Sequence, residues 1–240
     1  MAYLERAGVR ISHQITGERN GNLPVLLSNG FGESASMWEP NVGALAATRP
    51  VITWDMRGHG GSDCPSDPGA YTREHCVQDM AALLDAYEFP QAVLGGLSLG
   101  GYFSLAFYLA LPERVAALML FDCGPGFRND KARQDWNDRA LATAGRLERE
   151  GRHGLALAAR GMLTQPDSRV IDSLPAIEVP VLVLVGARDR GYLGAADYMA
   201  AKIRGAQRRV IDDAGHMSNA DQPGEFNRVV TAFLDQLDRL

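Results

Sequence analysis

One short segment constrains the fold of this chain more than any other: the sequence G-L-S-L-G at positions 96–100, centred on Ser98. The apolar run Ala92–Leu94 precedes it, and the largely apolar stretch Tyr102–Leu109 follows it. This pattern predicts a buried strand, a tight turn and a helix. Glycines on both sides of the serine let the neighbouring backbone pass closely, so the Ser98 hydroxyl should project above the sheet edge. The N–H of Leu99 should then face an incoming carbonyl oxygen.

Two further predicted strands end close to residues that can cooperate with this serine. The run Val181–Val185 leads into Asp189, and the segment Arg209–Asp212 leads into His216. The carboxyl ends of parallel strands meet at one edge of a sheet, which is where ligands bind in such folds. A serine hydroxyl needs an adjacent base to remove its proton and a third group to orient that base. His216 and Asp189 are therefore the predicted base and acid for Ser98.

The order of serine, acid and histidine along the chain resembles that of the α/β-hydrolase family, and the resemblance covers nearly the whole sequence. A D-x-R-G-x-G-x-S turn at positions 55–62 is a second mark of that family. The resemblance implies a single domain over residues 1–240, with a mostly parallel eight-stranded sheet flanked by helices. It also implies a short helical cap inserted at residues 125–178. Within that insertion, Asp135–Glu150 and Gly154–Leu163 have the pattern of polar, partly amphipathic helices.

The loop after the strand Val25–Ser28 also resembles a family feature. Asn29-Gly30-Phe31-Gly32 is similar to the H-G-F/W-G loop that supplies one oxyanion-hole donor, with asparagine in place of the usual histidine. The resemblance implies that the N–H groups of Phe31 and Leu99 hold the oxyanion. We expect Asn29 to change how the loop is supported more than it changes the oxyanion donor, because that donor is a backbone N–H group.

Two residues compete with the predicted acid and base. Asp122 follows the predicted strand Val115–Phe121, and its position matches that of the acid in some relatives. We favour Asp189, because the turn in which it lies resembles the usual acid turn of the fold. His59 lies in the glycine-rich turn after the strand Val51–Trp54, and we interpret it as part of that turn, which needs glycines and polar caps for backbone reasons.

The remaining pattern predicts an alternation of strands and helices. An antiparallel hairpin should combine Tyr3–Arg6 with Val9–Thr16, and the parallel part should begin after Pro24. Besides the strands named above, Ala92–Leu97 and Gln207–Ile211 are predicted to be strands. The predicted helices outside the cap are Met37–Ala47, Thr72–Tyr87, a helix after Ser98, Ala195–Ile203 and Pro223–Leu237.

Composition excludes several classes of function. A net charge of −5 gives no electrostatic basis for binding nucleic acid or an anionic membrane surface. The three cysteines are widely spaced, which fits neither a disulfide framework nor a zinc site, so we expect reduced thiols and no metal. The motifs that bind dinucleotides, nucleotides or peptidase zinc are missing, so no cofactor is predicted.

The location of the protein is also a prediction. The first residues contain neither a basic leader nor an apolar segment, so the expected location is the cytoplasm, and a homo-oligomer is left open. The uncharged segment Ala92–Leu111 has the length of a membrane span. Four glycines within it would weaken a helix and instead favour a strand, a turn and a second, shorter helix.

These features predict a cofactor-free serine hydrolase that cleaves a small carboxylic ester or lactone through an acyl-serine intermediate. The segment 97–101 is similar to the elbow of enol-lactonases, whereas dehalogenases and epoxide hydrolases of this fold would carry aspartate in place of Ser98. The same triad serves C–C bond hydrolases, perhydrolases and thioesterases, and hydrolase-fold receptors retain it with incidental turnover, so these alternatives stay open. The candidate apolar walls of the substrate pocket are Phe31, Trp38, Leu99, Trp136, Met162 and Met217.

Overall fold

Eight strands form one sheet within residues 1–239, the part of the chain that the computed structural model describes. Their order across the sheet is β1-β2-β4-β3-β5-β6-β7-β8. β1 and β2 pair antiparallel, β2 pairs antiparallel with β4, and all other neighbours are parallel. The predicted mostly parallel, eight-stranded sheet is confirmed. The strands are β1 (Ala2–Arg6), β2 (Val9–Thr16), β3 (Val25–Ser28), β4 (Val51–Trp54), β5 (Ala92–Leu97), β6 (Val115–Phe121), β7 (Val181–Gly186) and β8 (Gln207–Ile211).

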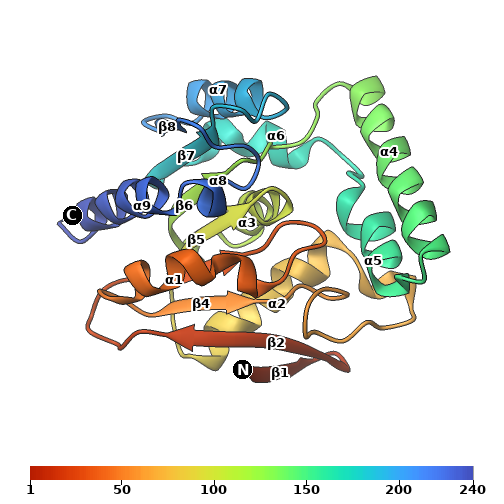
Figure 1. Cartoon of the computed structure of the whole chain (residues 1–240), viewed down its shortest axis with the longest axis horizontal. Coiled ribbons are helices and arrows are strands. Elements are labelled where there is room, and N and C mark those ends of the chain that lie inside the picture. Colours follow the sequence, from red (N-terminus) through yellow and green to blue (C-terminus); the bar gives the residue numbers. More distant parts are fainter. Residues whose placement is uncertain (240) are drawn as a thin grey trace.

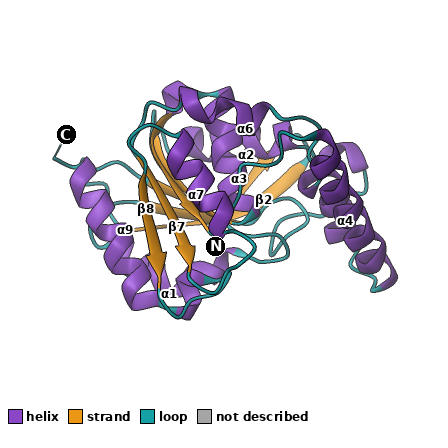
Figure 2. Cartoon of the chain, turned by 90° about the horizontal axis from the view of Figure 1, so that it is seen from above, coloured by secondary structure: helices purple, strands orange, loops and turns teal. Residues whose placement is uncertain are grey.

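Helices cover both faces of this sheet (Figure 1). Figure 2 shows α1 and α9 on one side, with α2, α3, α6 and α7 on the other. The α-helices are α1 (Glu39–Ala46), α2 (Arg73–Ala86), α3 (Leu99–Ala110), α4 (Asp130–Arg149), α5 (His153–Ala158), α6 (Arg169–Ser173), α7 (Leu193–Lys202), α8 (Ser218–Asp221) and α9 (Pro223–Leu237). Short turns of other helix types are η1 (Ala35–Trp38), η2 (Pro68–Ala70), η3 (Pro112–Arg114), η5 (Leu174–Ala176) and the π-helical η4 (Ala159–Leu163).

Side chains of the parallel strands alternate between two apolar cores. Val25 and Leu27 of β3 belong to the core beneath α1 and α9, whereas Leu26 belongs to the core beneath α2 and α3. This alternation follows from the two-residue period of a strand. Every residue of β3, β4 and β5 is buried, as expected for parallel strands with helices on both faces.

The uncharged segment Ala92–Leu111 divides as the glycines predict. Its first part is the central strand β5 and its second part is α3, with Ser98 at the junction. Among residues 1–239, no helix is both long and apolar enough to cross a membrane.

The segment between β6 and β7 contains α4, α5, η4 and α6, and α4 and α5 lie beyond one end of the sheet in Figure 1. A small apolar cluster of its own joins α4 to α5 and η4: Ala144, Leu147, Ala156 and Ala159. α4 begins at Asp130, five residues before the predicted start. The reason is a cap, because the Asn129 side chain accepts a hydrogen bond from the Ala132 N–H at 3.0 Å.

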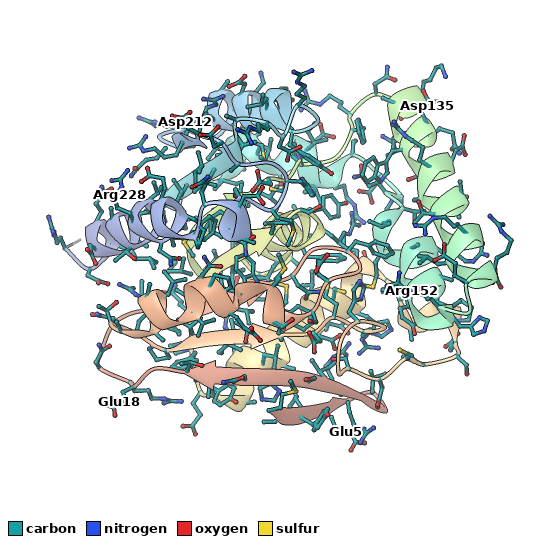
Figure 3. The ribbon with its side chains drawn as sticks, in the orientation of Figure 1. Glu5, Glu18, Asp135, Arg152, Asp212 and Arg228 are labelled. Atoms are coloured by element: carbon teal, nitrogen blue, oxygen red, sulfur yellow. The ribbon has the colours of Figure 1, made fainter. Side chains whose placement is uncertain are left out.

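Charged side chains of both signs are spread over the surface. The six residues labelled in Figure 3 come from well-separated parts of the chain, and all are exposed: Glu5, Glu18, Asp135, Arg152, Asp212 and Arg228. This distribution agrees with the modest net charge of the sequence.

Candidate active site

Ser98 occupies a strained position between β5 and α3. Its φ of 55° and ψ of −114° lie in a region that residues with a side chain rarely adopt. The two glycines of the motif make the tight turn sterically feasible. A Cβ on Gly96 would lie 2.2 Å from the Gly100 carbonyl carbon, and a Cβ on Gly100 would lie 2.2 Å from the Ser28 carbonyl oxygen. Only glycine fits at either position, so the motif is a requirement of this backbone.

The loop after β3 passes close to Ser98. A Cβ on Gly30 would lie 3.7 Å from the Ser98 Cβ. The Glu33 N–H donates to the Gly30 carbonyl at 3.2 Å, and Gly32 has a φ of 82°, which this tight turn requires. The Asn29 amide donates to the Gly30 and Glu33 carbonyls at 3.1 and 2.6 Å. Asn29 therefore supports the loop that carries Phe31.

The Leu99 N–H belongs to the first residue of α3, and the first N–H groups of a helix have no partner within it. The Leu99 N–H is thus available to donate a hydrogen bond on the side of the elbow where the helix begins. The pair of oxyanion donors expected from the sequence, the N–H groups of Phe31 and Leu99, stays a prediction.

His216 and Asp189 form a direct pair. The His216 Nδ1 lies 2.7 Å from the Asp189 Oδ2. Asp189 is buried, whereas the His216 side chain is 40% exposed. A carboxylate only accepts hydrogen bonds, so Nδ1 carries the proton and Nε2 is left free to accept one. The two loops are tied together, because the Arg188 N–H donates to the Ala214 carbonyl at 2.8 Å.

Asp122, the competing acid, has other partners. One of its oxygens accepts the Gly186 N–H at 2.7 Å, and the other accepts the Ser218 hydroxyl. The carboxyl group is fully buried, and this burial raises its pKa to about 7. Asp122 therefore connects the loop of Asp189 to the segment that follows His216, while the imidazole pairs with Asp189.

The D-x-R-G-x-G-x-S turn holds loops together. The Asp55 carboxylate accepts the N–H groups of Ala35 and Gly61 at 2.6 and 2.8 Å. The Ser62 hydroxyl donates to the Asp55 carbonyl at 2.6 Å. Arg57 forms a buried pair with Asp79 through two hydrogen bonds, at 2.5 and 2.8 Å. These contacts fix the path of the chain after β4.

His59, which lies in the same turn, is buried. Its Nδ1 lies 3.0 Å from the Arg57 carbonyl oxygen, and its ring packs edge-on against Phe31. Burial lowers its pKa, which favours the neutral ring. These contacts agree with our interpretation of His59 as part of the turn.

A cavity of about 540 Å³ opens at Ser98. Its walls are mostly apolar and aromatic. They come from the elbow (Ser98, Leu99), the loop after β6 (Gly124–Phe127), α4 (Trp136, Arg139), η4 (Met162, Leu163) and the segment around α7 (Tyr192, Tyr198). Of the walls predicted from the sequence, Leu99, Trp136 and Met162 line this cavity.

Three other predicted walls do not line it. Trp38 is fully buried in the core beneath α1 and α9, where its ring contacts Phe121 and Phe226. Met217 packs against the same core, and Phe31 packs against His59. A bulky apolar residue near an active edge can face either the core or the pocket, and the sequence does not distinguish the two.

Tyr192 is one of the residues at this site that were not predicted from the sequence. Its ring stacks on the His216 imidazole, with 4.9 Å between ring centroids and 27° between planes. It lies three positions after Asp189, but nothing in the sequence indicates that its ring turns back toward His216.

The comparisons with known proteins agree with the fold. Residues 25–229 match the model of the alpha/beta hydrolase family, so the chain belongs to that family. It is 28% identical to 3-oxoadipate enol-lactonase 1 of Acinetobacter baylyi, over 97% of this chain and 96% of the relative. It is also 28% identical to 2-hydroxymuconate semialdehyde hydrolase of Pseudomonas putida, over 98% and 94% of the two chains. The structure of a thermophilic esterase from Thermogutta terrifontis superposes with a TM-score of 0.86, at 30% identity, over 98% of this chain and 97% of that one.

Proposed function

We propose that this protein is a cofactor-free serine hydrolase that cleaves a small carboxylic ester or lactone through an acyl-Ser98 intermediate. One observation carries the proposal. Ser98 is held at a strained elbow that opens into a cavity, and the edge of the sheet that bears it also bears His216, paired with Asp189 at 2.7 Å. The family membership and the names of the relatives support hydrolysis.

In the first half of the proposed reaction, the Ser98 Oγ attacks the substrate carbonyl carbon while the His216 Nε2 takes the hydroxyl proton. The electron pair of the C=O bond moves to oxygen, where the N–H groups of Phe31 and Leu99 stabilise it. The Asp189 carboxylate stabilises the imidazolium. When the intermediate collapses, the C–O bond to the leaving group breaks, and His216 returns the proton to the departing oxygen.

In the second half, water takes the place of the serine hydroxyl. His216 removes a proton from the water as its oxygen attacks the acyl carbon, and the same two N–H groups stabilise the second oxyanion. Breaking the bond to Oγ releases the carboxylic acid, and the proton returns to Ser98. For a lactone, the leaving oxygen stays attached to the acyl group, so a single hydroxy acid is released.

The cavity supports a small and largely apolar substrate. The volume of about 540 Å³ lies within the usual range for small-molecule sites, and the walls of the cavity are mainly apolar and aromatic. Segment 125–178 supplies walls from α4 and η4, and we propose that it forms a cap over Ser98. The Trp136 indole N–H donates to the Leu163 carbonyl at 2.7 Å, so the one polar group of this side chain is already paired within the segment.

A fluorophosphonate probe, followed by a panel of short-chain esters and lactones, tests the proposal. We expect one probe molecule to attach to each chain, and mass spectrometry should locate it on Ser98. We also expect many turnovers per enzyme molecule on at least one ester or lactone. Labelling at another residue would contradict the proposal. A single slow turnover with retained product would indicate a receptor, and turnover only on substrates with a cleavable C–C bond would indicate a C–C bond hydrolase.

A further inference from the structure

Tyr192 contacts the candidate acid and base of the triad and lines the cavity at Ser98. Its backbone N–H donates to the Asp189 carbonyl at 3.0 Å, and its ring stacks on the His216 imidazole. Its side chain lines the same cavity as Ser98. Burial raises the pKa of the Tyr192 phenol.

The backbone fixes the position of this ring. Tyr192 is the residue before α7, and its carbonyl accepts the Ala196 N–H at 2.9 Å. The Leu193 N–H donates to the Asp189 carbonyl at 3.1 Å, so the turn and the start of the helix form one hydrogen-bonded unit. The ring is thus set by the same turn that sets the Asp189 carboxylate.

His216 needs such a neighbour. Its side chain is 40% exposed, so the protein covers only part of the imidazole. The imidazole becomes a cation each time it accepts a proton, and an aromatic face attracts a cation that lies over it. The charged or titratable groups that face His216 are Asp189, which is bonded to Nδ1, the buried Asp122, and the phenol of Tyr192 itself.

We propose that Tyr192 is a positioning residue of the triad, whose ring holds the His216 imidazole in its pairing with Asp189 and stabilises the protonated form of that imidazole. This inference rests on the proposed serine hydrolase function.

Ring-less and ring-retaining substitutions test it through the pH profile of kcat/KM on the best ester of the panel. In Tyr192→Leu, we expect kcat/KM to fall about twofold to fivefold, and the midpoint of the acid limb to move about 0.4 to 0.7 pH unit lower. The direction follows because loss of the aromatic face destabilises the protonated imidazole. In Tyr192→Phe, the acid limb should stay at the wild-type midpoint.

Two controls keep the test decisive. Tyr192→Met is a second ring-less variant, so the result does not depend on the folding of one protein. Tyr198→Leu removes another aromatic wall of the cavity whose ring lies near Lys202, and its acid limb should not move. The inference is overturned if the midpoint of the acid limb stays unchanged in both ring-less variants. It is also overturned if Tyr198→Leu shifts that midpoint by the same amount. If the wild type hydrolyses no ester or lactone, the proposed function itself fails.

Discussion

At the scale of single residues, the site depends on side chains held in costly or restricted states. The backbone of Ser98 is in a region that costs about 1–3 kcal/mol for a residue with a side chain. The surroundings hold it, because the Ser98 N–H donates to the Phe121 carbonyl at 2.9 Å and the backbone around the two flanking glycines is packed too closely for any side chain there. Strain of this kind, at a cavity mouth, is a mark of functional residues.

The two buried aspartates near His216 should differ sharply in their effect on turnover. Asp189→Asn keeps the shape of the side chain but removes the charge that holds the imidazole, so we expect kcat to fall by roughly three to four orders of magnitude. Asp122→Asn should cost far less, because its partners are Gly186 and Ser218. Steady-state kinetics of both variants, with folding checked by circular dichroism, decides between them. The opposite ranking would assign the acid to the end of β6.

At the scale of elements, Asp122 joins three segments of the active edge. It follows β6, accepts the N–H of the last residue of β7, and accepts the hydroxyl of the first residue of α8. The segments that carry the candidate acid and base are therefore fixed to each other through one buried carboxyl group. This connection gives Asp122 a role in stability that its position in the sequence does not reveal.

The protonation of Asp122 should make folding stability depend on pH. Burial raises the folded-state pKa to about 7, from an ordinary value of 3.8. Below about pH 4 the group is protonated in both states. Its stabilising contribution is then lost as the pH rises toward 7, because the folded state holds a proton that the unfolded state has released.

Thermal unfolding at pH 5 and pH 8 measures this effect. We expect the Tm of the wild type to fall between these values by at least about 3 °C more than that of Asp122→Asn, a difference equivalent to ~1 kcal/mol for a domain of this size. The amide is neutral at both values, so it lacks the contribution. Parallel Tm changes in the two proteins would show that Asp122 does not titrate in this range.

At the scale of the whole molecule, most of the fold was predictable from the sequence. Buried parallel strands are short apolar runs between turns, and Val25–Ser28 and Ala92–Leu97 match β3 and β5 at both ends. The predicted helix boundaries were less accurate where polar residues lie at the start of a helix. α4 begins five residues early because Asn129 caps it, and the predicted helix Met37–Ala47 is divided between η1, which ends at Trp38, and α1, which has Pro40 in its first turn.

The sequence predicted those site residues whose positions follow from the ends of strands. It did not predict those whose positions depend on side-chain packing. The pairing of His216 with Asp189 follows from the topology, because their strands are neighbours at one edge of the sheet. The orientation of an aromatic ring depends on the path of a loop and on its neighbours. For that reason Trp38, predicted to line the pocket, lies in the core, and Tyr192 was missed.

The central claim is that Ser98 is the nucleophile of an acyl-transfer reaction, and the turnover of Ser98→Ala tests it most directly. The substitution leaves the cavity, the backbone N–H donors and the histidine in place, so substrate binding should persist. We predict a loss of several orders of magnitude in kcat on the ester or lactone that the wild type hydrolyses best, because only oxyanion stabilisation and binding remain. A Ser98→Ala protein that keeps more than about a tenth of the wild-type kcat would contradict the claim, since removal of a triad nucleophile leaves far less activity.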